Sequence, residues 1–458
     1  MHRNLTPGLW NKFLGRMLGG ALLVAAASMA AAQDSNVVNS YQGPGVANLG
    51  VGDIGMRSGE QVSLRYFAGV SGVVETNLQP FALDAQGNLL RIHNLYGVQL
   101  TGGVYGVHHW KRSQLGLDYG GDYHKYVNSD AYNGSDQHLT LGYTVQPARH
   151  WSLDLRETAS TYSMATNELV DTSSNEANPV FTPTTMLFDS RSTFLQSSAH
   201  ATYLQSARTS FTFGGDGFLQ DQKAFGLSNS GGYDMTGSVQ HRMSKNTTLG
   251  ATYSYSHFEL PAFHITSDSN TYHGTFATAI GRSWTLSVEA GVTITEVNSQ
   301  LTFALSPELA ALFGVPSLME NAYTRSLFPS GSAILQRKFR RANLAFNYLR
   351  AIYSGNGASG AARQDNAFMS FSYTAMRKLN IGVNGGYYRL TSIGQNTGTF
   401  ANYAGSAGFT YTLGHSISLS ARYDVNQLQI DLGNYKRTST GATLGLVFSP
   451  GSVPLALW

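Results

Sequence analysis

One strict alternation of apolar and polar side chains constrains the fold of this chain more than any other feature. The segment GRSWTLSVEAGVTITEV, residues 281–297, places apolar residues at every even position from Trp284 to Ile294, with polar or very small residues between them. Successive side chains of a β-strand point to opposite faces, so the segment predicts a strand with one apolar and one polar face. Glu289 falls on the polar face, where it needs water or an opposite charge.

The same alternation recurs in about eighteen segments, each long enough to cross a bilayer as a tilted strand. Clear examples are residues 113–123, 138–145, 247–256 and 416–425. Lipid offers no partners to backbone N–H and C=O groups, so such a sheet must close on itself. The pattern predicts an all-β chain, a transmembrane antiparallel barrel of about eighteen strands, in which the segment 62–72 pairs with the segment 440–448.

A soluble β-sandwich also alternates, but three features favour the membrane barrel. Charged residues make up 12% of the chain, about half the share usual in soluble proteins. Short basic turns alternate with longer polar loops, as expected for periplasmic turns and extracellular loops. Aromatic residues fall near strand ends and predict two interfacial girdles. The predicted loops are residues 78–94, 124–135, 164–192, 296–329, 355–365 and 427–437. The girdle candidates are Trp110, Trp151 and Trp284 beside short turns, and Tyr123, Tyr255, Tyr353, Tyr387 and Tyr423 near the loops.

The first 32 residues have the organisation of a secretory signal peptide. Basic residues precede the apolar run LGGALLVAAASM, and Ala30 and Ala32 form a cleavage site that would release Gln33. A retained membrane anchor is the alternative, and the polar stretch that follows does not favour it. We therefore expect a signal peptide (1–32), a periplasmic N-terminal segment (33–60), the barrel (61–449) and a C-terminal tail (450–458). The chain has no cysteine, which excludes disulfides, thiolate metal sites and a lipid-anchored terminus.

With these features the chain resembles the bacterial outer-membrane β-barrels of porin size, over about residues 61–449. The resemblance implies an outer-membrane location, contact with outer-membrane lipids, and a terminal aromatic residue read by the barrel-assembly machinery. Phe448 ends the last predicted strand, but the chain continues to Trp458, so either residue is a candidate for that signal. The tail also resembles that of uncharacterised barrels, some of which accompany polysaccharide export, and export would add periplasmic partners.

Charged residues on the polar face are the first candidates for function, because that face would line the lumen. Both signs occur, which predicts no strong anion or cation selectivity. The alternative is that these side chains fill the lumen as ion pairs. The candidates are Arg65, Asp118, Asp122, Asp154, Arg156, Asp216, Asp234, Arg242, Glu289, Arg422 and Asp424.

Two other segments have the residues for a specific role. Within the loop 296–329, Ser306, Pro307 and Glu308 begin a short amphipathic helix, which would either constrict the lumen or pack at the surface. The basic residues of the short turns would pair with anionic lipid headgroups. They are Lys111, Arg112, Arg149, Arg282, Arg337, Lys338, Arg340, Arg341, Arg377 and Lys378.

The most favoured function is a channel for passive passage of small hydrophilic solutes. The alternatives are a polysaccharide export barrel and a surface-binding barrel with an occluded lumen. We expect no enzyme activity: the pattern predicts that His264, Asp268 and His273 lie in one polar loop, which is a weak signal for catalysis or metal binding. The sequence indicates no cofactor and no metal site, and the net charge of +3 is too small to indicate nucleic-acid binding.

Overall fold

The computed structural model describes a barrel wall and leaves the chain termini and several connections undescribed. The described residues are 64–76, 94–128, 132–162, 192–222, 228–304, 317–354, 361–376, 378–393, 398–431 and 435–449. The predicted signal peptide, the segment 33–60, the tail with Trp458, the helix at 306–314 and most of the loop 164–192 lie outside them. Among the described residues, no helix is long and apolar enough to cross a membrane.

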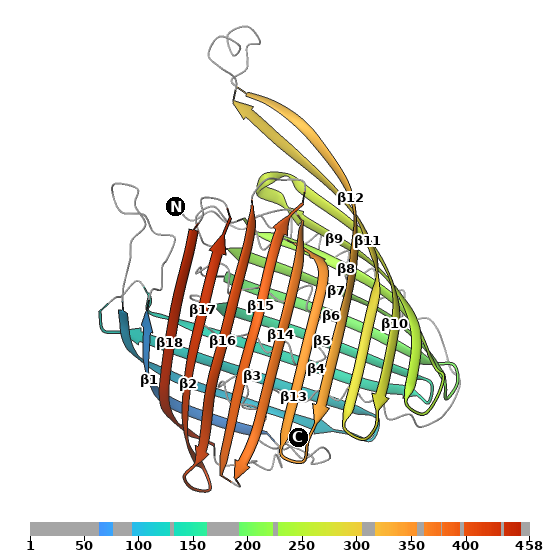
Figure 1. The fold of residues 1–458 in the computed structure, drawn as a ribbon. Helices are drawn as coiled ribbons and strands as arrows, with labels where there is room; N and C mark the ends of the chain where they lie inside the picture. Colours follow the sequence, from blue (N-terminus) through green and yellow to red (C-terminus); the bar gives the residue numbers. More distant parts are fainter. Residues whose placement is uncertain are drawn as a thin grey trace.

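Eighteen antiparallel strands form one sheet that closes on itself (Figure 1). Each strand pairs with the strands before and after it in the chain. The strands are β1 (Arg65–Thr76), β2 (Asn94–His109), β3 (Ser113–Tyr126), β4 (Gly134–Ala148), β5 (Trp151–Tyr162), β6 (Ser192–Leu204), β7 (Thr209–Gln222), β8 (Ser230–Arg242), β9 (Thr247–Leu260), β10 (Ile265–Ile280), β11 (Trp284–Ala304), β12 (Ser317–Lys338), β13 (Ala342–Tyr353), β14 (Ala362–Met376), β15 (Leu379–Ser392), β16 (Thr399–Thr412), β17 (Ile417–Ile430) and β18 (Tyr435–Phe448).

The barrel closes where the first strand meets the last. β1 pairs with β18 from Ala68–Phe448 to Thr76–Thr440, and with β2 along its other edge. At Thr76 the two hydroxyl groups of the pair also lie 2.8 Å apart. This pairing confirms the predicted fold class, a closed antiparallel barrel with eighteen strands.

The two ends of the barrel differ, as the turn pattern predicts. At one end, here called the turn end, the connections are short: 110–112, 149–150, 205–208, 243–246, 281–283, 339–341, 377–378 and 413–416. At the other, here called the loop end, they are 77–93, 127–133, 163–191, 223–229, 261–264, 305–316, 354–361, 393–398 and 431–434. Several predicted loops were too long. β3 runs to Tyr126 and β4 begins at Gly134, so the loop 124–135 is shorter at both ends, and β17 and β18 leave only residues 431–434 between them.

The largest correction concerns the predicted loop 296–329, most of which is strand. β11 and β12 stay paired from Trp284–Arg337 to Ala304–Ser317, and their hairpin projects beyond the rim of the barrel (Figure 1). β12 pairs with β13 only from Gly331–Arg350 to Lys338–Asn343, so its remaining part has no partner on that edge within the described residues. The polar composition predicted a loop here; Pro329 lies in the part of β12 whose other edge has no partner among the described residues, and a proline is tolerated on an edge strand.

Buried apolar side chains gather near the loop end rather than along the whole barrel. One cluster joins Phe194, Phe218 and Phe258, whose rings lie about 6 Å apart, to Leu260 and Ile265. These residues stand at the loop-end halves of β6, β7, β9 and β10, on the face that carries the buried polar residues. The polar face is therefore apolar near the loop end, which the alternation alone did not predict.

Candidate functional site: the inward face of the barrel

The outward face of the wall is apolar. In β1 the exposed positions alternate with buried ones, so that Tyr66, Val70 and Val74 point outward while Val73 and Glu75 are buried. The neighbouring strand β2 continues the surface with exposed Val98 and Leu100. Val70 is 50% exposed, so about half of the surface of this aliphatic residue has no protein cover. Such a surface, repeated around a closed barrel, fits contact with lipid.

The structure places the sequence-predicted charged residues on the inward face, because each lies in register with inward neighbours. Arg65 lies opposite buried Tyr105, and Asp216 lies opposite Asp234. Asp118, Asp216 and Asp424 are buried. The full set is distributed over β1 (Arg65), β3 (Asp118, Asp122), β5 (Asp154, Arg156), β7 (Asp216), β8 (Asp234, Arg242), β11 (Glu289) and β17 (Arg422, Asp424).

Many of these charges have partners on the same or the next strand. The Arg422 Nε donates to Asp424 Oδ1 at 2.7 Å, and the Thr144 hydroxyl donates to Asp154 Oδ2 at 2.6 Å. Glu289 lies 3.9 Å from a ring nitrogen of His273. Groups of both signs thus lie on the inner wall, and ion pairs and hydrogen bonds account for part of the charge.

Three inward histidines follow one common arrangement, and only one of them, His273, was considered from the sequence. His138, His200 and His273 each lie directly opposite a glycine of the neighbouring strand, Gly120, Gly214 and Gly291 respectively. A Cβ at Gly120 would come within 2.5 Å of the His138 ring, and one at Gly291 within 2.8 Å of the His273 ring. The missing side chain therefore lets each imidazole lie flat across the neighbouring strand.

Each of these histidines also meets a carboxylate two residues along from its glycine. The ring nitrogens lie 3.6 Å from Asp118 for His138 and 3.4 Å from Asp216 for His200. This arrangement leaves a trace in the sequence, because the histidine, the glycine and the acidic residue all occupy positions on the polar face of their strands. Finding it requires the register between strands, which the sequence alone did not give.

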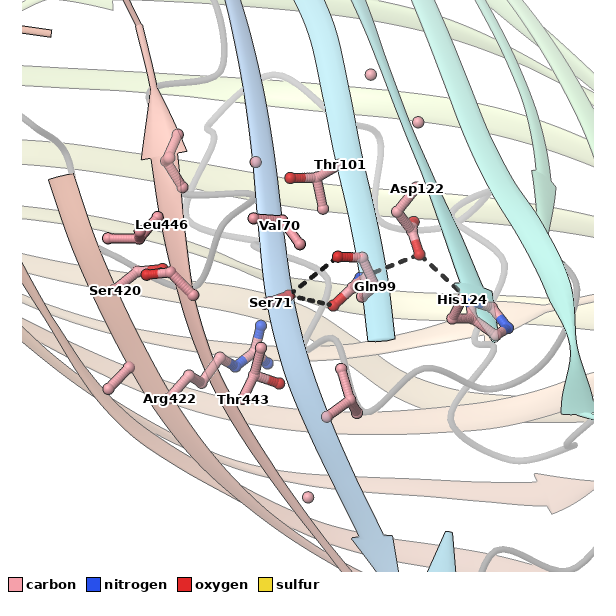
Figure 2. Close-up of a pocket in the computed structure, with 18 of the residues that line it drawn as sticks. Val70, Ser71, Gln99, Thr101, Asp122, His124, Ser420, Arg422, Thr443 and Leu446 are labelled. Carbon is pink, nitrogen blue, oxygen red and sulfur yellow. Dashed lines mark hydrogen bonds and ion pairs between the residues drawn. The ribbon is translucent and has the colours of Figure 1, made fainter. Parts of the chain in front are cut away.

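A recess in the inner wall lies across the seam where the barrel closes. Residues of β1, β2, β3, β4, β17 and β18 surround about 1160 Å³ of space, which includes open solvent (Figure 2). Its polar groups form a chain: Ser71 meets Gln99 at 3.5 Å, Gln99 donates to Asp122 at 3.0 Å, and Asp122 lies 3.3 Å from His124. Arg422 of β17 extends toward Ser71 of β1 across the intervening strand β18 (Figure 2). The recess offers donors, acceptors and both charges to a polar solute.

The aromatic girdle candidates take several positions. Trp110 follows β2 directly and is exposed, while Trp151 and Trp284 begin β5 and β11 at the turn end. The Arg337 guanidinium lies 4.8 Å from the centre of the Trp284 ring. Tyr123, Tyr387 and Tyr423 point outward, with Tyr423 near the middle of β17. Tyr255 points outward and donates to Asp268.

Two sequence interpretations of this region need correction. Tyr353 is buried beside Tyr388 and Leu390 on the inner side rather than standing in an outer girdle. The segment with His264, Asp268 and His273 is not one polar loop: His264 follows a short 3₁₀ turn, and β10 contains the other two. Asp268 and His273 are five residues apart on a strand, so they face opposite sides of the wall and cannot act together.

Comparisons with known proteins give weak matches only. No family model matches the chain, and no curated protein does. Among solved structures, OpdL of Pseudomonas aeruginosa is 11% identical, with 86% of this chain and 99% of that chain covered and a TM-score of 0.38. OccK2 (OpdF) of the same organism is 9% identical, with 85% and 99% covered and a TM-score of 0.41. A BenF-like porin from Pseudomonas fluorescens Pf-5 is 10% identical, with 84% and 98% covered and a TM-score of 0.40. Because these values are low, the fold class rests on the strand pairing.

Proposed function

We propose that this chain is an outer-membrane channel through which small hydrophilic solutes pass passively. The observation that supports this most is the opposite chemistry of the two faces of one closed wall. The outward face carries exposed aliphatic and aromatic residues, and the inward face carries charges of both signs with hydroxyl and amide groups. Barrels of about this strand number commonly enclose an aqueous passage.

The inner wall would act on solutes through local fields and hydrogen bonds. Because acids, arginines and histidines are mixed on this wall, we expect local fields that orient polar solutes without excluding one sign of charge. The recess with Gln99, Asp122 and Arg422 brings several such groups together in one place. Dedicated export of a charged polymer is less favoured, because it would suit a lumen of one sign.

The buried cluster near the loop end supports a second candidate, a barrel whose lumen is occluded there. Phe218 and Phe258 are almost fully buried although they point inward, so other parts of the chain cover them. An occluded barrel would bind ligands at its surface or open only with a partner. The two candidates differ in whether the resting protein conducts ions.

The location and the partners belong to the same proposal. A signal peptide over residues 1–32 would direct export, and the barrel-assembly machinery would read an aromatic residue near the end of the chain. Phe448 closes β18 and points outward, which is the position such a signal needs, while Trp458 remains the alternative. Exchange of each for alanine, with barrel insertion measured in cells, distinguishes the two.

Single-channel conductance in a planar bilayer tests the proposal. The refolded protein is compared with a variant lacking residues 300–325, which form the outer part of the β11–β12 hairpin. A steady ohmic conductance of the intact protein supports an open channel. If the intact protein does not conduct but the deletion variant does, the hairpin acts as a gate. If neither the intact protein nor the deletion variant conducts, although circular dichroism shows that both are folded, the open channel is contradicted and the occluded barrel is favoured.

A further inference from the structure

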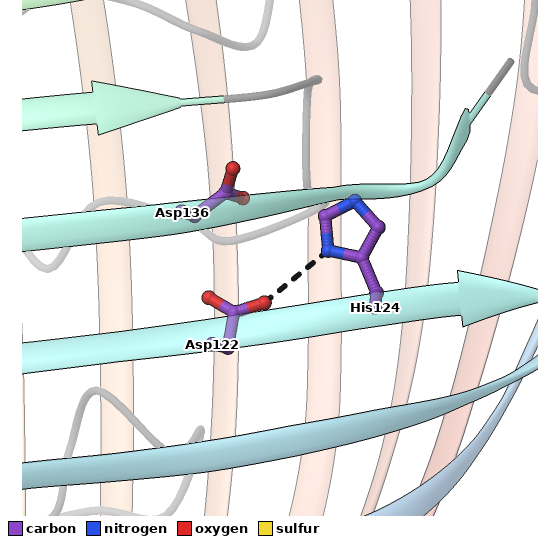
Figure 3. A group of neighbouring side chains, drawn as sticks. All are labelled: Asp122, His124 and Asp136. Carbon is purple, nitrogen blue, oxygen red and sulfur yellow. Dashed lines mark hydrogen bonds and ion pairs between the residues drawn. The ribbon is translucent and has the colours of Figure 1, made fainter.

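Three metal-ligating side chains meet near the loop ends of β3 and β4 (Figure 3). Asp122 and Asp136 lie directly opposite each other in the register of the two strands. His124, two residues beyond Asp122 on the same face, turns its ring toward both carboxylates (Figure 3). One possible ligand atom from each of the three lies within 4.8 Å of the others.

The site is buried and carries an excess of negative charge. His124 is 4% exposed and Asp136 is 6% exposed. The charged groups that act on the His124 ring are the carboxylates of Asp122, Asp136 and Glu75. Several carboxylates grouped around one imidazole repel each other where water is scarce, and the free energy of that arrangement falls when a cation joins them. A divalent ion would offset this charge.

Surrounding groups hold one ligand, Asp122, and the segments beside the site in place. Gln99 donates to Asp122 at 3.0 Å, and the Tyr126 hydroxyl donates to Glu75 at 2.6 Å. The backbone N–H of Tyr126 donates to the Asn133 side chain at 2.8 Å, which fixes the connection between β3 and β4. Partners of this kind hold the first ligands of metal sites in place and raise metal affinity.

The donor set indicates the class of metal. Carboxylates alone would suit calcium or magnesium, whereas imidazole suits zinc and the neighbouring transition metals. Zinc with bonds of about 2.0–2.2 Å holds its ligand atoms roughly 3.4 Å apart, so small side-chain movements would close the present spacing. No other group of described residues meets this spacing. Asp122 and His124 also line the recess, which gives an ion a path from the lumen.

We propose that Asp122, His124 and Asp136 form a binding site for a zinc-class divalent cation. The ion would take one ring nitrogen of His124 and one oxygen from each carboxylate, with water completing its coordination. A cation bound there joins β3 to β4 near the loop ends of the two strands. The inference does not depend on solute passage, because a barrel with an occluded lumen would hold the same site.

Zinc binding by the refolded full chain tests the proposal. After treatment with a chelator, the protein is titrated with Zn²⁺ in competition with a chromophoric indicator. We expect one ion per chain, and a loss of affinity of at least tenfold in His124→Gln and in Asp136→Asn. His138→Gln is the matched control, because His138 lies on β4 and also pairs with an aspartate but lies outside the group.

A spectroscopic measurement on the unmodified chain keeps the test independent of variant folding. X-ray absorption of the zinc-loaded protein should show a shell of nitrogen and oxygen atoms at about 2.0–2.1 Å with the signature of an imidazole. Absence of zinc uptake, an equal loss in His138→Gln, a shell without imidazole, or binding of Ca²⁺ in place of Zn²⁺ would each overturn the assignment.

Discussion

The outward and inward faces of the wall formed by β10, β11 and β12 differ in almost every respect except the backbone that makes them. On the outward face Val288 lies between Phe276 and Ala333, and on the inward face Glu289 lies between Thr275 and Ser332. Val288 and Glu289 are consecutive residues. A shift of pairing by one residue would exchange the two surfaces, so register, rather than composition, separates them.

The largest expected effect comes from placing a charge on the wrong face. Val288 lies four residues from Trp284, which puts it near the middle of an apolar band of about 25 Å. Val288→Arg should lower the free energy of unfolding by about 2–4 kcal/mol, because the guanidinium would enter hydrocarbon. Urea titration of the protein refolded in lipid vesicles measures this.

The adjacent position provides the matched control. Ser287→Arg places the same side chain on the same strand but toward the lumen, and should change stability by less than about 1 kcal/mol. Equal losses in the two variants would mean that the two faces are not distinct environments, and the comparison would fail.

A smaller effect should follow from filling the space above a glycine. A Cβ at Gly214 would collide with the His200 ring, whereas a Cβ at Gly72 would meet nothing within 4 Å. Gly214→Ala should cost about 1–3 kcal/mol and separate His200 from Asp216, because the ring has to move. Gly72→Ala should stay within about 0.5 kcal/mol of zero. Thermal unfolding of both variants, compared side by side, gives the answer; a neutral Gly214→Ala would show that the ring moves freely.

The smallest effect concerns a single inward charge. Glu289→Gln removes one negative group from a wall that carries both signs, so the ratio of cation to anion permeability should change by less than about twofold. Reversal potentials across a salt gradient measure the ratio. A large change would indicate that Glu289 stands at a constriction and that the mixed charges do not share the field.

The sequence predicted the fold well because alternation and closure are both requirements of a strand in lipid. It failed where local composition and pairing disagree. Residues 317–329 contain polar residues and a proline, which resemble a loop, yet pairing with β11 holds them as a strand. Propensity is local, and a long antiparallel ladder outweighs it.

The inner wall was only partly predictable, for a related reason. The alternation predicted on which face of the wall each charged residue lies. It predicted neither the position of the residue along the barrel axis nor its neighbour on the next strand. The environment of His138, for example, depends on Gly120 and Asp118, which belong to the neighbouring strand. His124 was hidden in a different way, because the predicted loop 124–135 removed it from β3, and Asp136, directly after that loop, was not among the polar-face candidates.

The unpaired edge of β12 fixes how deep the barrel can sit in a membrane. Within the described part of the chain, this edge has no neighbouring strand beyond Gly331, and hydrocarbon could not satisfy its backbone groups, so the apolar slab must end near that level. From Arg337, the partner of Trp284 at the opposite interface, β12 rises about 3.3 Å per residue at a tilt of about 40°. The hydrophobic thickness on this side is then roughly 20 Å. Such a footprint matches a thin bilayer, and the bacterial outer membrane is thinner than most.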